Sequence, residues 1–163
     1  ITTINNVKAI IEVKSKILNT TLRDIINKFD NCLTNFNDIN SCRKNNKYEI
    51  FTGIFAFDFE GSINLEILED SLKNSKTIVN HISLGTKYFI KKWGRGDKNL
   101  LRATIDCKGD FYRVYEINNL SFSYFISNII DITSGGLTDR SWYSYPLEGT
   151  KEAYSIHTVC LEK

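Results

Sequence analysis

At 163 residues, with 42% hydrophobic and 25% charged residues, the chain has the size and composition of one globular domain with its own core. The formal net charge of +2 and the scatter of the basic residues argue against nucleic acid or an acidic membrane as a partner. No apolar run approaches the roughly 20 residues that a membrane-spanning helix needs, so a transmembrane segment is excluded.

Residues 4–36 carry the periodicity of an amphipathic helix. Apolar side chains recur at spacings of three, four and seven and form one stripe: Ile4, Val7, Ile11, Leu18, Leu22, Ile25, Phe29, Leu33 and Phe36. The triplet Asn19-Thr20-Thr21 interrupts good helix formers, and Thr20 or Thr21 is a suitable cap for a second helix. The pattern predicts either one kinked helix or two consecutive helices.

From residue 48 to about residue 161 the period changes to two, which is typical of strands. The clearest alternation lies at residues 101–108, and another lies at residues 62–67. Turn residues such as Gly85-Thr86 and Gly109-Asp110 separate the runs, and Gly109-Asp110 is the best hairpin signal. Eight or nine short strands joined by turns indicate an antiparallel meander.

Together these patterns predict one α+β domain over residues 1–163. The apolar stripe of the helical segment needs a surface that covers it. We therefore expect the segment at about residues 4–36 to pack on a curved antiparallel meander or barrel of about eight strands, formed by residues 48–161.

The motif Arg95-Gly96-Asp97 lies in a predicted turn at residues 93–98. Adhesion receptors of the integrin class bind this tripeptide, taking its carboxylate on a divalent metal and its guanidinium on an acidic groove. The sequence therefore predicts partner binding through Arg95, Gly96 and Asp97. An ordinary turn is the alternative, because Gly and Asp also suit turn geometry.

No nucleophile, metal or phosphate-binding motif appears, so we expect no cofactor, no metal site and no enzymatic activity. His81 and His157 fit ordinary sheet positions, although His157 and Cys160 have the spacing of half a zinc site. The alternative is a hydrolase that uses paired acids as proton donor and acceptor. Its candidates are Asp58 with Glu60, and Glu66 with Glu69 and Asp70.

The β-rich part holds more aromatic bulk than a minimal core needs: Phe55, Phe57, Tyr88, Phe111, Tyr115, Phe122, Tyr124 and Phe125. These side chains either fill the sheet interior or line a cavity for a small apolar ligand. Trp142, Tyr143 and Tyr145, beside Gly135-Gly136, predict an aromatic edge at residues 134–146. Such an edge favours self-assembly into a homo-oligomer.

Four cysteines and the start of the chain favour an exported protein. The chain begins at Ile1 and contains no Met, which predicts a processed product whose signal peptide has been removed. An even number of cysteines is typical of secreted domains and predicts two disulfides, of which Cys32–Cys42 and Cys107–Cys160 are favoured among three connectivities. An intracellular domain with four buried thiols is the alternative.

Two Asn-x-Ser/Thr triplets begin at Asn19 and Asn119 and are candidate glycosylation sites. The sequence therefore predicts a secreted, disulfide-stabilised, non-enzymatic binding protein. Such a protein carries a small apolar ligand, or binds a partner or cell-surface receptor through residues 93–98. A self-assembling extracellular structural subunit and an acid-pair hydrolase are the alternatives.

Overall fold

The computed structural model describes residues 7–41, 50–76, 78–94, 107–134 and 148–161. In this part of the chain six strands form one sheet, in which the spatial order of the strands follows the chain order. The strands are β1 (Ala9–Ile17), β2 (Phe51–Phe59), β3 (His81–Leu84), β4 (Tyr88–Trp93), β5 (Phe111–Glu116) and β6 (Ser155–Cys160). The helices are α1 (Asn19–Ser41), α2 (Leu65–Lys73), α3 (Ser121–Ser134) and the 3-10 helix η2 (Glu148–Tyr154).

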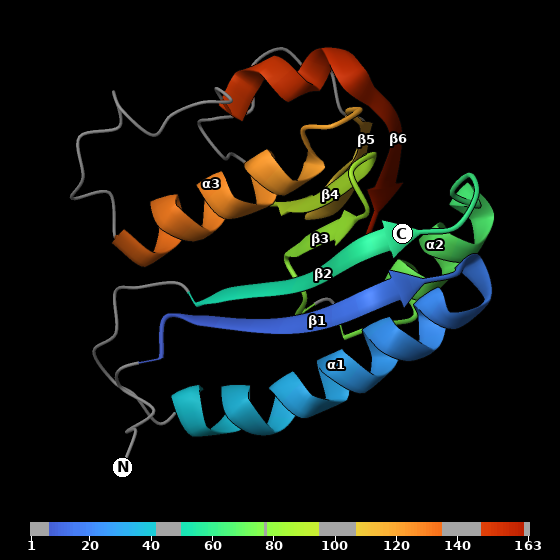
Figure 1. Ribbon diagram of the computed structural model, residues 1–163. Coiled ribbons are helices and arrows are strands. Elements are labelled where there is room, and N and C mark those ends of the chain that lie inside the picture. Colours follow the sequence, from blue (N-terminus) through green and yellow to red (C-terminus); the bar gives the residue numbers. More distant parts are fainter. Residues whose placement is uncertain (1–6, 42–49, 77, 95–106, 135–147, 162–163) are drawn as a thin grey trace.

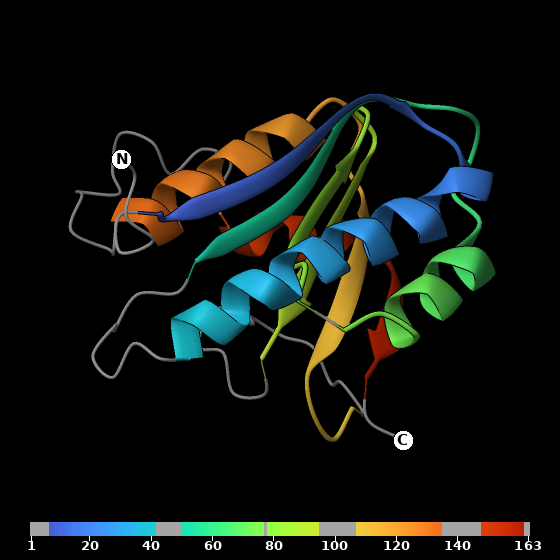
Figure 2. The ribbon, with the colours of Figure 1, turned by 90° about the horizontal axis from the view of Figure 1, so that it is seen from below.

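The first half of the sheet is parallel and the second half is antiparallel. β1 pairs with β2 and β2 pairs with β3 in parallel, whereas β3 to β6 pair antiparallel. Parallel neighbours need crossover connections, which α1 and α2 supply on one face of the sheet. The helix α3 lies on the opposite face, so the sheet is covered on both sides (Figures 1 and 2).

Each face of the sheet has its own apolar cluster. The larger cluster joins the sheet to α1 and α2 through residues such as Ile26, Leu33, Leu68, Ile54 and Val114. The smaller and more aromatic cluster joins it to α3 through Phe51, Phe89, Tyr115, Ile117, Tyr124 and Phe125. Successive β2 residues enter opposite clusters because side chains alternate along a strand. Phe51 to Ile54 are all buried, so this part of β2 is covered on both faces.

The helix expected at residues 4–36 is wrong in its first half. Residues 9–17 form the strand β1, and the helix begins at Asn19 and continues to Ser41. Thr21 does mark the start of a helix, because its hydroxyl accepts a hydrogen bond from the Leu18 backbone N–H at 3.2 Å. This contact is one half of a capping box. Residues 9–17 are rich in β-branched side chains, which favour a strand. In this segment, pairing with β2 outweighs the helical spacing of Ile11 and Leu18.

The antiparallel meander or barrel of about eight strands is also wrong, although the α+β class is confirmed. The described sheet is open and mixed, and three segments of the expected β-rich part, α2, α3 and η2, are helices. The second half of the alternating run at residues 62–67 belongs to α2, whose N-cap Asn64 accepts a hydrogen bond from the Ile67 N–H at 3.0 Å. The strand expected at residues 101–108 lies outside the described residues, apart from Cys107 and Lys108.

Candidate binding surface

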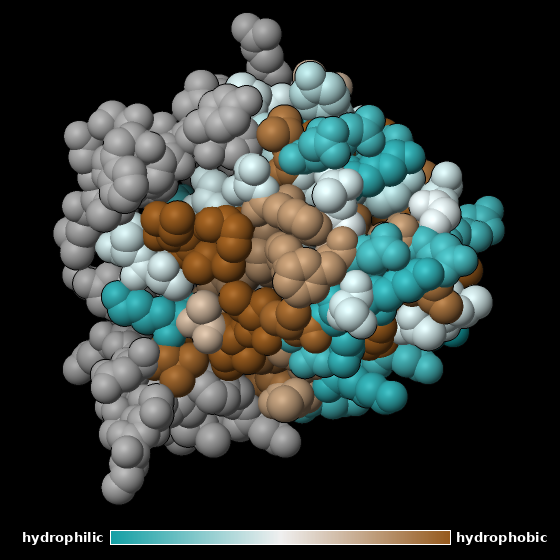
Figure 3. All heavy atoms as spheres, in the orientation of Figure 1, coloured by the Kyte–Doolittle hydropathy of each residue, from teal (hydrophilic) through white to brown (hydrophobic). Residues whose placement is uncertain are grey.

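Three large apolar side chains are exposed next to one another at the β1 end of the sheet. Val13 of β1 is 56% exposed, Phe57 of β2 is 61% exposed and Ile126 of α3 is 49% exposed. With the half-buried Phe55 and Phe122 they form what we call the apolar surface. Figure 3 shows apolar side chains gathered over α3 and the neighbouring strands in this region.

Ring contacts join the phenylalanines of the apolar surface, and strand register and helix periodicity place Val13 and Ile126 beside them. The ring centroids of Phe55 and Phe122 are 4.8 Å apart, and those of Phe55 and Phe57 are 5.1 Å apart. Val13 is the register partner of Phe55 on the adjacent strand, and Ile126 lies one helical turn after Phe122. Monomeric soluble proteins rarely expose large contiguous apolar patches, so this surface is typical of an interaction site.

The apolar surface stays open because of where α3 packs. This helix mainly contacts β2, β3 and β4 and buries Tyr124 and Phe125 against them. Gly53 of β2 permits the close approach, because a Cβ atom at that position would lie 2.6 Å from the Phe125 ring. The helix therefore lies close to β2 and leaves Val13 of β1 exposed, although Ala9 and Ile11 are partly buried on the same face.

The strand β1 is an edge of the sheet. It is the first strand in the order, and β2 is its only strand partner among the described residues. An edge strand presents unpaired backbone N–H and C=O groups that can pair with another chain. The apolar surface and this backbone edge thus adjoin each other.

A buried polar network lies farther along the α3 face and fixes η2 to the sheet. The Lys151 side chain is fully buried, with its Nζ 4.8 Å from the Trp93 ring centroid and 5.3 Å from that of Tyr115. Glu152 accepts hydrogen bonds from Arg113 Nη1 at 2.5 Å and from the Tyr115 hydroxyl at 2.7 Å. Burial, followed by the Glu152 charge, raises the pKa of Tyr115. These contacts pair the protein's own charges and rings, and they are typical of a structural network.

His81 occupies a fully buried position beside this network. Its Nδ1 lies 2.7 Å from Asn80 Oδ1, its Nε2 lies 3.2 Å from Asn128 Oδ1, and its ring stacks on Phe51. Burial, and then the nearby Lys91 charge, hold the pKa of His81 well below its usual value. The imidazole is therefore neutral at physiological pH and acts as a packed sheet residue.

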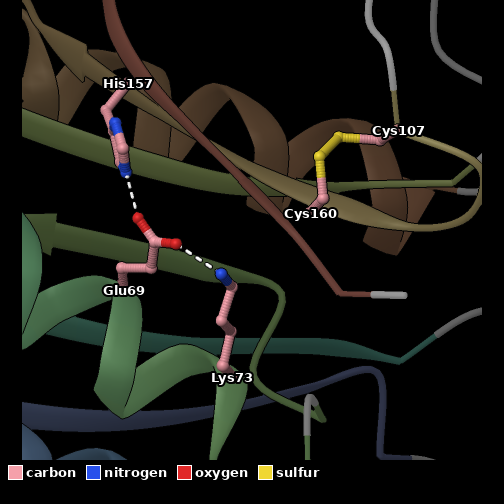
Figure 4. The surroundings of a disulfide bond; sticks show 5 residues. All are labelled: Glu69, Lys73, Cys107, His157 and Cys160. Atoms are coloured by element: carbon pink, nitrogen blue, oxygen red, sulfur yellow. Dashed lines mark hydrogen bonds and ion pairs between the residues drawn. A yellow bond between two sulfur atoms is a disulfide. The ribbon is translucent and has the colours of Figure 1, made fainter. Parts of the chain in front are cut away.

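His157 takes part in an ion-pair chain that connects β6 to α2. Its Nε2 lies 2.7 Å from Glu69 Oε2, and the other oxygen of Glu69 binds Lys73 (Figure 4). The hydrogen bond from Lys73, followed by that from His157, lowers the pKa of Glu69. The exposed fractions of the Lys73, Glu69 and His157 side chains are 44%, 32% and 28%. These contacts help to attach α2 to β6 at the edge of the sheet.

The other candidate acids lie at the surface, and two of them are paired with basic side chains. Asp58 and Glu60 are exposed at the end of β2, and Glu60 forms an ion pair with Lys16 at 2.5 Å. Asp70 forms an ion pair with Arg23, and Glu66 is exposed in the first turn of α2. The acid-pair hydrolase, which needs two carboxyl groups that flank one bond of a substrate, stays a prediction.

A polar pocket of about 240 Å³ lies between α1 and the end of α2. Its lining includes the buried Asp30, whose Oδ1 accepts a hydrogen bond from the Val79 N–H at 3.1 Å and whose Oδ2 has no hydrogen-bond partner. The remaining lining residues are Asn27, Asn31, Asn74, Ser75 and Lys76. This polar lining does not match the aromatic cavity that an apolar-ligand carrier needs.

The structure contains a disulfide between Cys107 and Cys160, one of the two pairs that the sequence favours (Figure 4). It joins the residues that precede β5 to the last residue of β6, so it connects neighbouring strands. Cys32 is an exposed free thiol, and its expected partner Cys42 lies outside the described residues.

Of the other predicted site residues, the structure describes Asn19 and Asn119. Arg95, Gly96 and Asp97 lie outside the described residues, as does the aromatic cluster at residues 142–145. Asn119 is exposed in a turn with φ of 65°. The side chain of Asn19 instead donates to the Ser62 carbonyl at 2.9 Å and accepts from the Asn64 N–H at 2.8 Å.

Two searches of the described residues and three comparisons gave negative results. No group of three or more His, Cys, Asp or Glu side chains in the described ranges is arranged to hold a metal ion. Likewise, none of the described helices is long and apolar enough to cross a membrane. No protein-family profile matches the chain, and neither curated proteins nor solved structures give a match.

The sequence pattern placed Phe55, Phe57 and Phe122 in the sheet interior, either as core or as the lining of an apolar-ligand cavity. It missed Val13 and Ile126 as parts of a surface. The common parity of Phe55 and Phe57 was a usable signal, because it places both rings on one face of a strand.

Proposed function

We propose that this chain is an exported, disulfide-stabilised, non-enzymatic binding protein whose partner is a protein that docks on the apolar surface. The observation that carries the proposal is the exposure of Val13, Phe57 and Ile126 beside an edge of β1 to which none of the described segments adds a strand. Apolar contact area supplies affinity, and backbone groups of the edge strand supply direction and register.

Export is supported by the Cys107–Cys160 disulfide, because such bonds persist mainly in oxidising compartments. Partner docking is favoured over ligand carriage by the packing of the aromatic side chains. Phe89 and Tyr124 stack at 5.9 Å and Phe51 meets Phe125 edge-on at 5.2 Å, so these rings fill the space between α3 and the sheet. Binding through Arg95, Gly96 and Asp97 stays a prediction for the loop at residues 93–98.

Site-specific photo-crosslinking tests the docking surface. A photoreactive phenylalanine analogue is placed at position 57, and in a matched protein at position 154, where Tyr154 is 55% exposed outside the apolar surface. On irradiation in the medium of cells that export the protein, we expect a defined product from position 57 and none from position 154.

The specificity of that product is tested by a second change in the protein that carries the analogue at position 57. Ile126→Asp should abolish the product, because a charge on the apolar surface is costly to desolvate, whereas Ile156→Asp, at an exposed side chain of β6, should not. Equal products from positions 57 and 154, or equal products with the two second changes, would contradict the proposal.

A further inference from the structure

The outward-facing backbone groups of β1 follow from its pairing with β2. The Lys8 carbonyl accepts a hydrogen bond from the Phe51 N–H at 2.9 Å, so Lys8 directs its backbone groups toward β2. Orientation alternates along a regular strand, so Glu12 and Lys14 also face β2, while Ala9, Ile11 and Val13 direct their N–H and C=O groups away from β2. The alternation breaks before Ile17, because the Ile17 carbonyl also accepts a hydrogen bond from beyond β2, from the Glu60 N–H at 3.2 Å.

The two faces of β1 differ in chemistry. Ala9 and Ile11 pack against the aromatic cluster under α3, and Val13 continues this row into the apolar surface. The opposite face carries Glu12 and Lys14, which form an ion pair at 2.5 Å with both side chains more than one-third exposed. An added strand would therefore meet an apolar row on one face and a short charged row on the other.

This charged row is complementary to itself when two copies of β1 run antiparallel. With Val13 opposite Val13 of a second copy, Glu12 lies opposite Lys14 of that copy, and Lys14 lies opposite its Glu12. If one strand shifts by two residues relative to the other, like charges meet. A shift one way places Glu12 opposite Glu12 of the second copy, and a shift the other way places Lys14 opposite Lys14. Opposite charges across a strand pair stabilise it and like charges destabilise it, so one register is favoured.

The same register satisfies the backbone and the apolar face. Val13 faces outward, so the two copies of Val13 exchange both of their backbone hydrogen bonds across the twofold axis. Phe57 lies beside Ser15 in the register of β2 with β1, since Lys14 pairs with Ala56 and Lys16 with Asp58. Ser15 in turn lies opposite Ile11 of the second copy, and its small side chain leaves room for the Phe57 ring to reach that residue.

We propose that the partner of the apolar surface is a second copy of this chain, paired antiparallel through the β1 edges with Val13 at the twofold axis. This proposal rests on the proposed function and specifies its partner. The resulting dimer has one continuous sheet, and the two apolar surfaces form a trough between the two copies of α3. Closed twofold pairing also removes the open edge that would otherwise template further addition.

Sedimentation velocity of the purified full chain tests the dimer. Between about 1 µM and 100 µM we expect a monomer–dimer equilibrium for the wild type. Either Glu12→Lys or Lys14→Glu replaces two attractive cross-strand pairs by repulsive ones and should weaken dimerisation roughly thirtyfold. The double variant Glu12→Lys/Lys14→Glu should dimerise like the wild type, because it restores both pairs.

Mixing gives a sharper test of the register. Equal amounts of the Glu12→Lys and Lys14→Glu proteins should form a mixed dimer, although each protein alone is monomeric at the same concentration. Ile156→Lys, a charge on the exposed side chain of the other edge strand, is the matched control and should leave the wild-type equilibrium unchanged. Amide hydrogen exchange at Ile11 and Val13 should slow on dimerisation, while exchange at Glu12 should not change.

The outcomes separate this proposal from the proposed function. A wild type that stays monomeric throughout, or a dimer that survives Glu12→Lys but is lost with Ile156→Lys, would overturn the β1 dimer. If the crosslink from position 57 then joins the chain to a different protein, the docking surface stands and only the second copy as partner is wrong. If position 57 gives no specific product and the chain is monomeric, both proposals fail.

Discussion

At the residue scale, His81 couples the stability of the protein to pH. Its ring is enclosed by Phe51, Asn80 and Asn128, and burial lowers its pKa well below 6.5. The unfolded chain takes up a proton at this position below pH of about 6.5, whereas the folded protein does so only at much lower pH. The free energy of unfolding therefore decreases as the pH falls through that window.

We expect the stability of the wild type to fall between pH 6.5 and pH 5 with a slope approaching about 1.4 kcal/mol per pH unit from His81. His81→Gln should remove this part of the slope, although it lowers stability at pH 7. Urea unfolding at several pH values measures both effects. The lowered pKa of Glu69 acts in a more acidic range, because its usual value is already 4.5. Parallel pH profiles for the two proteins would contradict the assignment.

The sequence indicated correctly that His81 occupies a sheet position, but it could not show what encloses the ring. Asn128 lies 47 residues away along the chain, and only the packing of α3 on β3 brings the two side chains together. The Asn128 side chain also accepts a hydrogen bond from Lys91 Nζ and donates one to the Tyr124 carbonyl. No local pattern encodes such a contact.

At the element scale, the packing of α3 on the sheet depends on Gly53. A Cβ atom there would lie 2.6 Å from Phe125 Cζ and 2.7 Å from Phe51 Cε1, which is too close for both rings to remain in place. Gly53→Ala should therefore lower the free energy of unfolding by about 1–3 kcal/mol, the usual cost of overpacking a core.

Gly94→Ala is the matched control, because the nearest atom to its added Cβ is Asp110 Oδ1 at 3.9 Å. We expect a change within about 1 kcal/mol there, mostly through the unfolded chain. Urea unfolding of the three proteins measures the difference. Equal effects at the two positions would show that α3 does not depend on the close approach at Gly53.

Element type was predicted well only where the local pattern was unambiguous. In α1, Leu22, Phe29 and Leu33 of the expected stripe are buried, whereas Ile25 is half-buried and its neighbour Ile26 is buried instead. In β1, Ile11 and Leu18 fit the same helical stripe, but Ala9, Ile11 and Val13 also fit a strand, and pairing with β2 decides between the two. In α2, the alternation of Ile63, Leu65 and Ile67 concealed the spacing of Leu65, Leu68 and Leu72.

At the scale of the whole molecule, the disulfide closes the largest covalent loop that the described residues contain. Cys107 and Cys160 are 53 residues apart, and the enclosed chain includes β5, α3, η2 and most of β6. The loop-entropy estimate for this length is about 4 kcal/mol. The bond therefore stabilises the antiparallel half of the sheet, including the helix that supports the apolar surface.

We expect the double variant Cys107→Ser/Cys160→Ser to lose up to about 4 kcal/mol of unfolding free energy. Cys32→Ser is the control and should have little effect, because that thiol is free and exposed. Urea unfolding of both variants and of the wild type checks the prediction. A double variant as stable as the wild type would mean that the enclosed loop is already constrained when the chain is unfolded.

The candidate site itself is a property of the whole molecule. Val13, Phe57 and Ile126 come from three elements, and their proximity follows from the order of the strands and the side on which α3 returns. Strand parity predicts which face Phe57 occupies. It cannot predict that α3 packs on β2 to β4 and leaves Val13 of β1 exposed, since this depends on long-range packing around Gly53.

The agreement between strand order and chain order has a consequence for synthesis on the ribosome. Each of the described strands β2 to β6 pairs with the described strand made just before it, so these strands need no later strand before they can dock. The β1–β2 unit can assemble while later strands are still being made. The Cys107–Cys160 bond forms late, because Cys160 is the last residue of β6, so the parallel half can fold before this bond is made.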